Sequence, residues 1–306
     1  AAATTDAAGE FELRVAGAAS PAALAGGLVR VEREGAGCAD AGTGAPPPVS
    51  LGALVPKYDK AEAKPYVAVN GVTTLGYYTK KNAAKPQITP YLALVGGADF
   101  DAASFYKGFG GALGIGGGER AGTTDLLAAA ARGDADAAKG QALSAQILNS
   151  LAVGGQGLAG LKPGVSPDAA AEAMVVATFP AAAAITKSGK TFDLASPASL
   201  AAVFNKALGG APPDVVDAVS DALADANAAA GDGVGEKGVK RAAAALAFGQ
   251  ADLGPAARAA AAAAKEGGLD EFSAKYGSRA SVQAAVDAAE EKKGGGGSRR
   301  RRLLRA

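Results

Sequence analysis

The sequence predicts an α+β chain that consists of a β-rich N-terminal part, a mainly α-helical, Ala-rich bundle and a disordered basic tail. Three observations lead to this prediction. Residues 10–15 alternate between polar and apolar side chains, which is typical of a half-buried strand. Residues 134–230 contain short Ala-rich segments with clear helix start and stop residues. A glycine-rich linker at residues 294–298 precedes four consecutive arginines.

Residues 1–75 are expected to form a partial β module. After the alternating residues 10–15, a second strand is predicted at residues 28–33. The prolines at 46–48 favour an extended edge, because proline cannot donate to a central strand ladder. Residues 66–70 are expected to close this part.

Residues 121–266 are expected to form an Ala-rich helical domain. Its first long helix should start near Asp134 or Asp136, since either carboxylate can accept backbone N–H groups of the first turn. Gly154 and Gly155 are predicted to end this helix. Its buried face is a stripe of apolar side chains at three- and four-residue intervals, formed by Leu143, Ile147, Leu148 and Leu151.

Prolines mark the starts of the later helices. Ser166 and Ser196 each precede a proline, as expected at a helix N-terminus, and Pro213 opens a further helix. We expect a kink or break at Pro180, because proline removes one backbone donor and clashes with the preceding turn. Residues 254–255, a Gly-Pro pair, are expected to separate two further Ala-rich helices.

Composition excludes several classes of site. The chain of 306 residues has no histidine and one cysteine, Cys38. His-based nucleophile activation, His-ligated zinc and a disulfide within these residues are therefore excluded. The formal net charge of +1 gives no global field that attracts nucleic acid, so no nucleic-acid partner is expected. No run of about 18 apolar residues lacks polar interruption, so no membrane span is predicted.

Residues 76–120 are predicted to be an aromatic and glycine-rich connector. Lysines lie among its aromatic residues, a combination that also occurs on surfaces that stack carbohydrate or nucleic acid. The favoured interpretation is that the rings seal a domain junction, since each ring buries a large apolar area. The candidate ligand-contact residues are Tyr77, Tyr78, Tyr91, Phe105 and Tyr106.

No catalytic, cofactor-binding or metal-binding residue is predicted. The glycines at 114–118 lack the flanking strand and the Lys-Ser/Thr pair that a phosphate-binding loop requires. The acidic residues do not follow the alternating pattern of a calcium loop of the EF-hand type. Asp217, Asp221 and Asp225 have the four-residue spacing of a solvated helix face.

Residues 267–306 are expected to be weakly helical and then disordered. The basic run within them is the second candidate site, formed by Arg299, Arg300, Arg301 and Arg302. A solvated basic tail is the simplest interpretation. A protease processing site, a nuclear import signal and a surface-binding patch are the alternatives.

Short motifs in the N-terminal part resemble a known family. Residues 5–13, TDAAGEFEL, look like the "TDanGxFxL" hairpin of carboxypeptidase-regulatory-like and related Ig-like β-sandwich modules. Residues 37–51 and 69–75 are similar to the continuation in very large modular matrix and adhesin-type proteins of cyanobacteria and algae. In those proteins a helix ending in "ALGL" and an Ala-rich helical block follow, as residues 111–115 and 124–149 do here.

This resemblance implies a truncated β-sandwich-like module before the helical bundle. Ala8 replaces the usual Asn or Asp of the first turn, and Gly71 replaces the family proline. Residues 76–90 look inserted. The Asp-rich turn that often precedes the hairpin, a candidate calcium site, is expected upstream of Ala1, and no cofactor is expected within these residues.

The leading functional prediction is a non-enzymatic structural or adhesive module of a large extracellular or cell-surface protein. Its expected partners are neighbouring modules of the same parent chain and a glycan or matrix protein. One alternative is a carbohydrate- or protein-binding accessory module of a secreted enzyme. A more remote alternative is a hydrolase that uses paired carboxylates, which requires a convergent geometry that sequence cannot show.

Overall fold

The structure, a computed structural model, describes residues 24–31, 47–57, 67–84, 88, 92, 95, 97–112, 121–233 and 235–303. Within these ranges, the side chains at 110–112, 168 and 293–303 are not described. The strand expected at residues 10–15, Cys38, Tyr91 and the glycines at 114–118 lie outside the described residues.

The chain is mainly helical, and the predicted fold class is therefore wrong. The described part contains two strands, β1 (Leu28–Val31) and β2 (Leu51–Leu54), which pair antiparallel with Leu28 opposite Leu54. These two strands do not form a β-sandwich-like module. A two-stranded ribbon is marginal by itself, and β2 instead packs on helix α1 (Gly71–Lys81), where Leu54 is fully buried.

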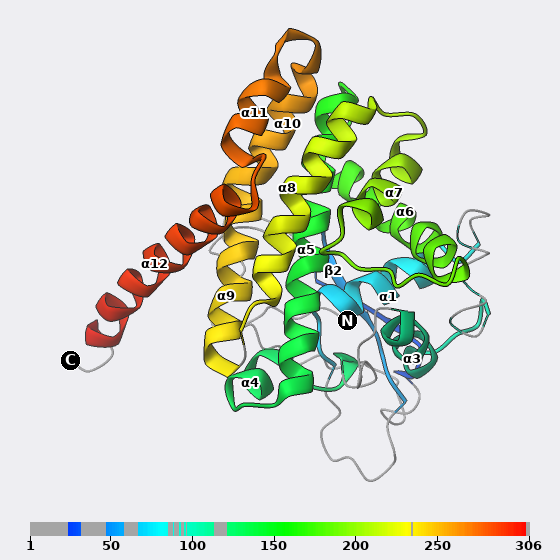
Figure 1. The fold of residues 1–306 in the computed structure, drawn as a ribbon. Helices are drawn as coiled ribbons and strands as arrows, with labels where there is room; N and C mark the ends of the chain where they lie inside the picture. Colours follow the sequence, from blue (N-terminus) through cyan, green and yellow to red (C-terminus); the bar gives the residue numbers. More distant parts are fainter. Residues whose placement is uncertain are drawn as a thin grey trace.

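Helices make up most of the described chain (Figure 1). After α1, their order is α3 (Ala102–Ala112), α4 (Leu126–Ala131), α5 (Ala135–Leu161), α6 (Pro167–Lys187), α7 (Pro197–Leu208), α8 (Pro213–Gly231), α9 (Gly235–Phe248), the π-helix η4 (Gly249–Leu253), α10 (Gly254–Ala262), the short 3-10 helix η5 (Ala264–Glu266), α11 (Gly268–Tyr276) and α12 (Arg279–Leu303).

Helix α5 is the central element, with α1, α4, α6, α8, α9 and α10 packed around it. It begins as predicted, because the Asp134 carboxylate accepts the N–H groups of Asp136 and Ala137. The predicted end at Gly154 and Gly155 is wrong, since the helix continues to Leu161. A methyl group on Gly155 would overlap Ala171 of α6, so these glycines allow two helices to approach closely instead of ending one.

Helix α6 starts as predicted, with the Ser166 hydroxyl accepting the N–H of Ala169 at 3.2 Å. At Pro180, where a kink or break was predicted, the helix does not break, because α6 continues from Pro167 to Lys187. Ala181 and Ala182 are buried directly after the proline, so packing against α5 and α7 holds the helix through it. The segment Ala169–Lys187 is long and apolar enough to cross a membrane by length and composition, and half of it is buried inside the protein.

The predicted starts of α7 and α8 are confirmed. Pro197 and Pro213 occupy first-turn positions, and Gly209 ends α7 in the left-handed conformation with φ of 61°. Ser196 does not cap α7 with its side chain. Instead, the Ser199 hydroxyl accepts the N–H of Asp193 at 3.3 Å and so fixes the loop before the helix.

The separation expected at Gly254-Pro255 is wrong. Helix α9 passes into the π-helix η4 and then into α10, so the chain stays helical from Gly235 to Ala262. Pro255 lies in the first turn of α10, where its missing N–H costs little. The irregularity at this point is a π-helical turn instead of a loop.

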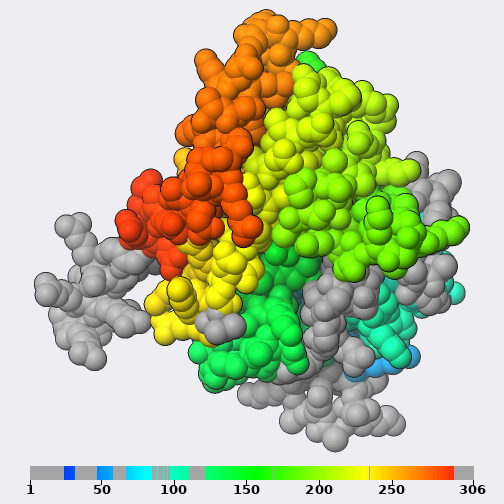
Figure 2. Space-filling view, viewed as in Figure 1, coloured from blue at the N-terminus to red at the C-terminus, as the bar shows by residue number. Residues whose placement is uncertain are grey.

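In the C-terminal region, α12 is helical from Arg279 to Leu303, through the glycines at 294–297, and residues 304–306 lie outside the described residues. Glycine in a helix interior costs about 1 kcal/mol relative to alanine, which weakens a helix without forbidding it. The N-terminal half of α12 packs on α8 and α9, where Val282 and Val286 are fully buried. Figure 2 shows α8, α9 and α12 packed side by side on one face.

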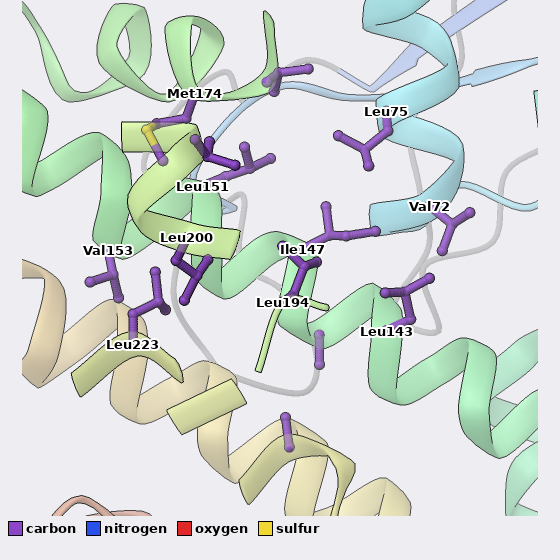
Figure 3. Close-up of a cluster of buried hydrophobic side chains, with 14 of the residues drawn as sticks. Val72, Leu75, Leu143, Ile147, Leu151, Val153, Met174, Leu194, Leu200 and Leu223 are labelled. Atoms are coloured by element: carbon purple, nitrogen blue, oxygen red, sulfur yellow. The ribbon is translucent and has the colours of Figure 1, made fainter. Parts of the chain in front are cut away.

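One hydrophobic core connects the strands, the aromatic helices and the bundle. It contains Val49 and Leu54 near the N-terminal end and Val282 and Val286 near the C-terminal end. Figure 3 shows Val72 and Leu75 of α1 beside Leu143 and Ile147 of α5 in this core. The predicted apolar stripe of α5 is buried, as are the larger side chains of α6, α7 and α8.

Candidate functional site

The aromatic cluster, defined as Tyr77, Tyr78, Phe105, Tyr106 and Phe109, joins α1 to α3. Tyr77 and Tyr78 meet edge to face with ring centroids 5.1 Å apart, and Phe105 stacks on Phe109 at 5.4 Å. These separations lie in the range where aromatic pairs contribute beyond their buried area. Each of the five rings is at least 93% buried, with Phe105 at 0% exposure.

Glycines allow β2 and α1 to reach these rings. A methyl group on Gly52 of β2 would overlap the Tyr77 ring, and one on Gly76 of α1 would lie 3.1 Å from the Phe105 ring. The Gly52 N–H donates to the Thr74 hydroxyl at 3.1 Å, which fixes the strand against the helix. The cluster is therefore built from close approach between backbone and rings on both sides.

Tyr78 is held at the end of this cluster by polar contacts. Its hydroxyl donates to the Ser50 carbonyl oxygen at 3.2 Å, and burial together with the nearby Glu172 carboxylate raises the pKa of Tyr78 well above its ordinary value. Lys81 lies 5.3 Å from the Tyr78 ring and forms an ion pair with Glu172 at 3.2 Å. These contacts connect α1 to α6.

The second lysine of α1 has a local role. Lys80 donates to the carbonyl oxygens of Ala98 and Phe100 at 3.0 and 3.1 Å. Its ammonium group also lies 4.8 Å from the centroid of the Phe100 ring. The ammonium group of Lys80 is therefore engaged with the Phe100 ring and with two backbone carbonyl oxygens.

The structure brings four of the five candidate ligand-contact residues together, but inside the core. Tyr77, Tyr78, Phe105 and Tyr106 have between 0% and 7% of their surface exposed. Stacking on a sugar ring requires an accessible ring face, which these side chains do not offer. Their burial matches the favoured interpretation, in which the aromatic residues seal the junction between the N-terminal part and the bundle.

A buried polar contact between α5 and α8 was not found from the sequence. The Asn227 side-chain amide donates to the Ser150 hydroxyl at 3.1 Å and to the Leu194 carbonyl oxygen at 2.8 Å. Gln146 donates to the Asn227 carbonyl oxygen at 2.9 Å. The Ala-rich stretch around Asn227 gave one signal, a lone amide on a predicted apolar face, but its partners are 33 to 81 residues away.

Asn149, the residue before Ser150 on α5, is buried without such contacts. Its side chain is 0% exposed, and neither of its polar atoms has a hydrogen-bond partner among the described residues. It lies directly against Gly249 of η4, where any added side chain would overlap it. The contact places the first residue of the π-helix next to a polar side chain in the core.

Arg241 of α9 is a buried cation in the bundle. Its side chain is 8% exposed and forms ion pairs with Asp287 and, at 3.2 Å, with Glu290 of α12. Both carboxylates are more exposed than the arginine, at 56% and 31%. The pairs fix the middle of α12 against α9.

Asp101 has a structural partner, and Asp217 and Asp221 are exposed on α8. Backbone donation from Ser104 holds the pKa of Asp101 below its ordinary value, consistent with a helix-start role before α3. Partial burial raises the pKa of Asp225, which lies on α8 with Asp217 and Asp221. Within the described ranges, no three His, Cys, Asp or Glu side chains lie close enough to hold a metal ion.

The basic run lies at the far end of α12. The backbone at Arg299, Arg300, Arg301 and Arg302 is helical. Figure 1 shows this end of α12, in red, pointing away from the other helices.

Comparisons with known proteins give no relative for this chain. No family model matches it, and neither the search of curated proteins nor the search of solved structures found a significant match.

Proposed function

We propose that this chain is a non-enzymatic structural module of a large extracellular or cell-surface protein. The observation that supports this most is the continuous core from Val49 to Val286, which makes the strands, the aromatic cluster and the bundle one mechanical unit. Three residues have side chains that could take part in chemistry: Tyr78, Asn227 and Arg241. The contacts of all three hold elements of the structure together. The expected partners are neighbouring modules and a glycan or matrix protein.

The packing of the bundle suits a stiff spacer. Glycine and alanine let α5 approach its neighbours closely, as at Gly155 against Ala171 and at Gly160 against the backbone of Arg258. Interiors packed at this proximity have low compressibility and transmit strain. A module of this kind holds its attached neighbours at a fixed separation under load.

Surface labelling tests the proposed location and role. An antibody raised against the folded chain should label intact, unpermeabilised cells or their matrix. On a denaturing gel it should detect a polypeptide larger than the 29.5 kDa of these residues. Labelling that appears only after permeabilisation would contradict the extracellular assignment, and a matching band at 29.5 kDa would contradict the modular one.

A glycan array separates the structural role from the accessory-module alternative. Because the aromatic cluster is buried, no bound glycan should contact the face of the Tyr77 ring. We therefore expect the Tyr77→Phe variant to keep any glycan binding that the wild-type chain shows. Specific binding that is lost in a folded Tyr77→Ala variant would favour the accessory module instead.

A further inference from the structure

Asn70 is followed by Gly71, and this pair lies where α1 begins. Of the five asparagines in the sequence, Asn70 alone precedes a glycine. Glycine has no side chain, so its backbone nitrogen can closely approach the side-chain carbonyl carbon of the residue before it. An attack within one molecule also proceeds at a high effective concentration once the two atoms meet. The pair is therefore the position at which an asparagine of this chain deamidates most readily.

The structure holds every group that this reaction needs. The Gly71 N–H donates to the Ser144 hydroxyl at 2.8 Å. The Asn70 side-chain amide donates to the Ala121 carbonyl oxygen at 2.9 Å, and its own oxygen accepts the N–H of Thr73 at 3.0 Å. The attacking nitrogen, the leaving nitrogen and the carbonyl oxygen are thus bound to α5, to the segment before α4 and to the first turn of α1.

Deamidation requires these bonds to be released. The Asn70 side chain has to turn so that its Cγ atom meets the Gly71 nitrogen, and that nitrogen has to give up its proton. Gly71 is buried, and its proton is directed at Ser144 instead of at water. The reaction therefore follows a local opening between α1 and α5, and its rate is set by the fraction of molecules that are open.

We propose that Asn70 is a latent modification site, which deamidates when α1 and α5 separate and whose modification weakens their junction. The Gly71 nitrogen forms a bond to Cγ of Asn70, the bond between Cγ and Nδ2 breaks, and ammonia leaves with the proton of the Gly71 N–H. The resulting cyclic imide is opened by water, which adds to one of its two carbonyl carbons and gives aspartate or isoaspartate. Water is the co-reactant, and no group is oxidised or reduced.

Either product disturbs the contacts that protected the asparagine. Aspartate at position 70 has no N–H to donate to the Ala121 carbonyl oxygen, so two acceptors face each other. Isoaspartate lengthens the main chain by one carbon atom, about 1.5 Å. There is no space for this beside Ser144, because even a methyl group on Gly71 would overlap its carbonyl oxygen.

Refolding does not reverse this covalent change, so the modified fraction records how long the junction has been open. The inference goes beyond the proposed function and does not rest on it, because it depends only on the contacts of Asn70 and Gly71.

Mass spectrometry tests the proposal on the full chain, incubated at mildly alkaline pH either folded or in urea. A peptide that contains Asn70 reports the mass gained when the amide becomes an acid, and labelling by an isoaspartate methyltransferase reports the second product. Each of the three hydrogen bonds should slow the reaction about fivefold. We therefore expect the folded chain to deamidate at Asn70 about a hundredfold more slowly than the unfolded chain.

Two serine variants of α5 separate the local contact from general stability. Ser144→Ala removes the acceptor of the Gly71 N–H, so deamidation of the folded chain should be about fivefold faster, with no change in urea. Ser150→Ala is the matched control, because Ser150 is also buried on α5 but bonds to Gln146 and Asn227. It should leave the rate at Asn70 within about twofold of wild type. Circular dichroism confirms that both variants fold.

The deamidated fraction carries an additional negative charge, so ion exchange separates it from the unmodified chain. It should unfold at lower urea than the unmodified chain, because the junction is weakened. The proposal is overturned by equal rates at Asn70 in the folded and unfolded chain, by absence of the reaction in both, by equal acceleration in the two serine variants, or by an unchanged urea midpoint of the deamidated fraction.

Discussion

The backbone N–H of Gly71 donates to the Ser144 hydroxyl at 2.8 Å, and this bond ties the first residue of α1 to the middle of α5. The neighbouring Asn70 side chain caps α1 and also donates to the Ala121 carbonyl oxygen at 2.9 Å. The N-terminal part and the bundle are thus joined by polar contacts as well as by the shared core.

Substitution of Gly71 should loosen this junction. A methyl group on Gly71 would overlap the Ser144 carbonyl oxygen, so Gly71→Ala is expected to lower the free energy of unfolding by about 1–3 kcal/mol. Gly157→Ala on α5 is the matched control, because the nearest atom to the added methyl group lies at 3.7 Å. It should be neutral or stabilising by up to about 1 kcal/mol. Urea denaturation measures both, and equal losses would contradict the proposed contact.

The Arg241 ion pairs predict an asymmetric response to mutation. Arg241→Met leaves only the partly exposed Asp287 and Glu290 unpaired, so it should cost about 1 kcal/mol or less. The double variant Asp287→Asn, Glu290→Gln leaves a buried guanidinium without a charged partner and should cost about 3 kcal/mol. Thermal unfolding of the two variants, measured in parallel, tests this order of stability losses. The opposite order would show that Arg241 is solvated.

Two buried asparagines should respond differently to replacement by leucine. Asn227 donates two hydrogen bonds, so Asn227→Leu removes them and leaves the Leu194 carbonyl oxygen without this donor, at a cost of about 2–4 kcal/mol. Asn149 makes none among the described residues, so Asn149→Leu should change stability by less than about 1 kcal/mol. Urea midpoints compare the two variants. A large loss in Asn149→Leu would reveal that its amide is hydrogen-bonded.

Tyr78 predicts how stability changes at alkaline pH. Its pKa is raised in the folded state, so above about pH 10 the unfolded chain loses a proton that the folded protein keeps. The free energy of unfolding should therefore fall as pH rises above about 10. Tyr78→Phe should be less stable than wild type by about 1 kcal/mol at pH 8, because the bond to Ser50 is lost. That deficit should shrink toward pH 11, and a constant deficit would exclude the tyrosine as the cause.

Local signals were sufficient to predict the helix starts. Asp134, Ser166, Pro197 and Pro213 act within one turn of their own position, so sequence alone identified them. Helix ends and breaks were predicted less well. Gly155 and Pro180 look like interruptions locally, but contacts between α5 and α6 hold the helices through them.

The position of the aromatic residues depended on partners distant in sequence. The clustering of Tyr77, Tyr78 and Phe105 in the sequence predicted an aromatic connector, but the burial of these rings depends on Gly52, Gly76 and β2. The Asn227 contacts likewise depend on residues up to 81 positions away. Such long-range pairs leave no periodic pattern in a single sequence.

We expect the N-terminal part and the bundle to unfold as one unit. Tyr276→Phe leaves tyrosines only at positions 58–106, so their fluorescence reports the N-terminal part while far-UV circular dichroism reports mainly the bundle. Urea titration of this variant should give coincident transitions by both probes, because the core is continuous from Val49 to Val286. A fluorescence transition at clearly lower urea than the circular dichroism transition would contradict the claim and show two separable units.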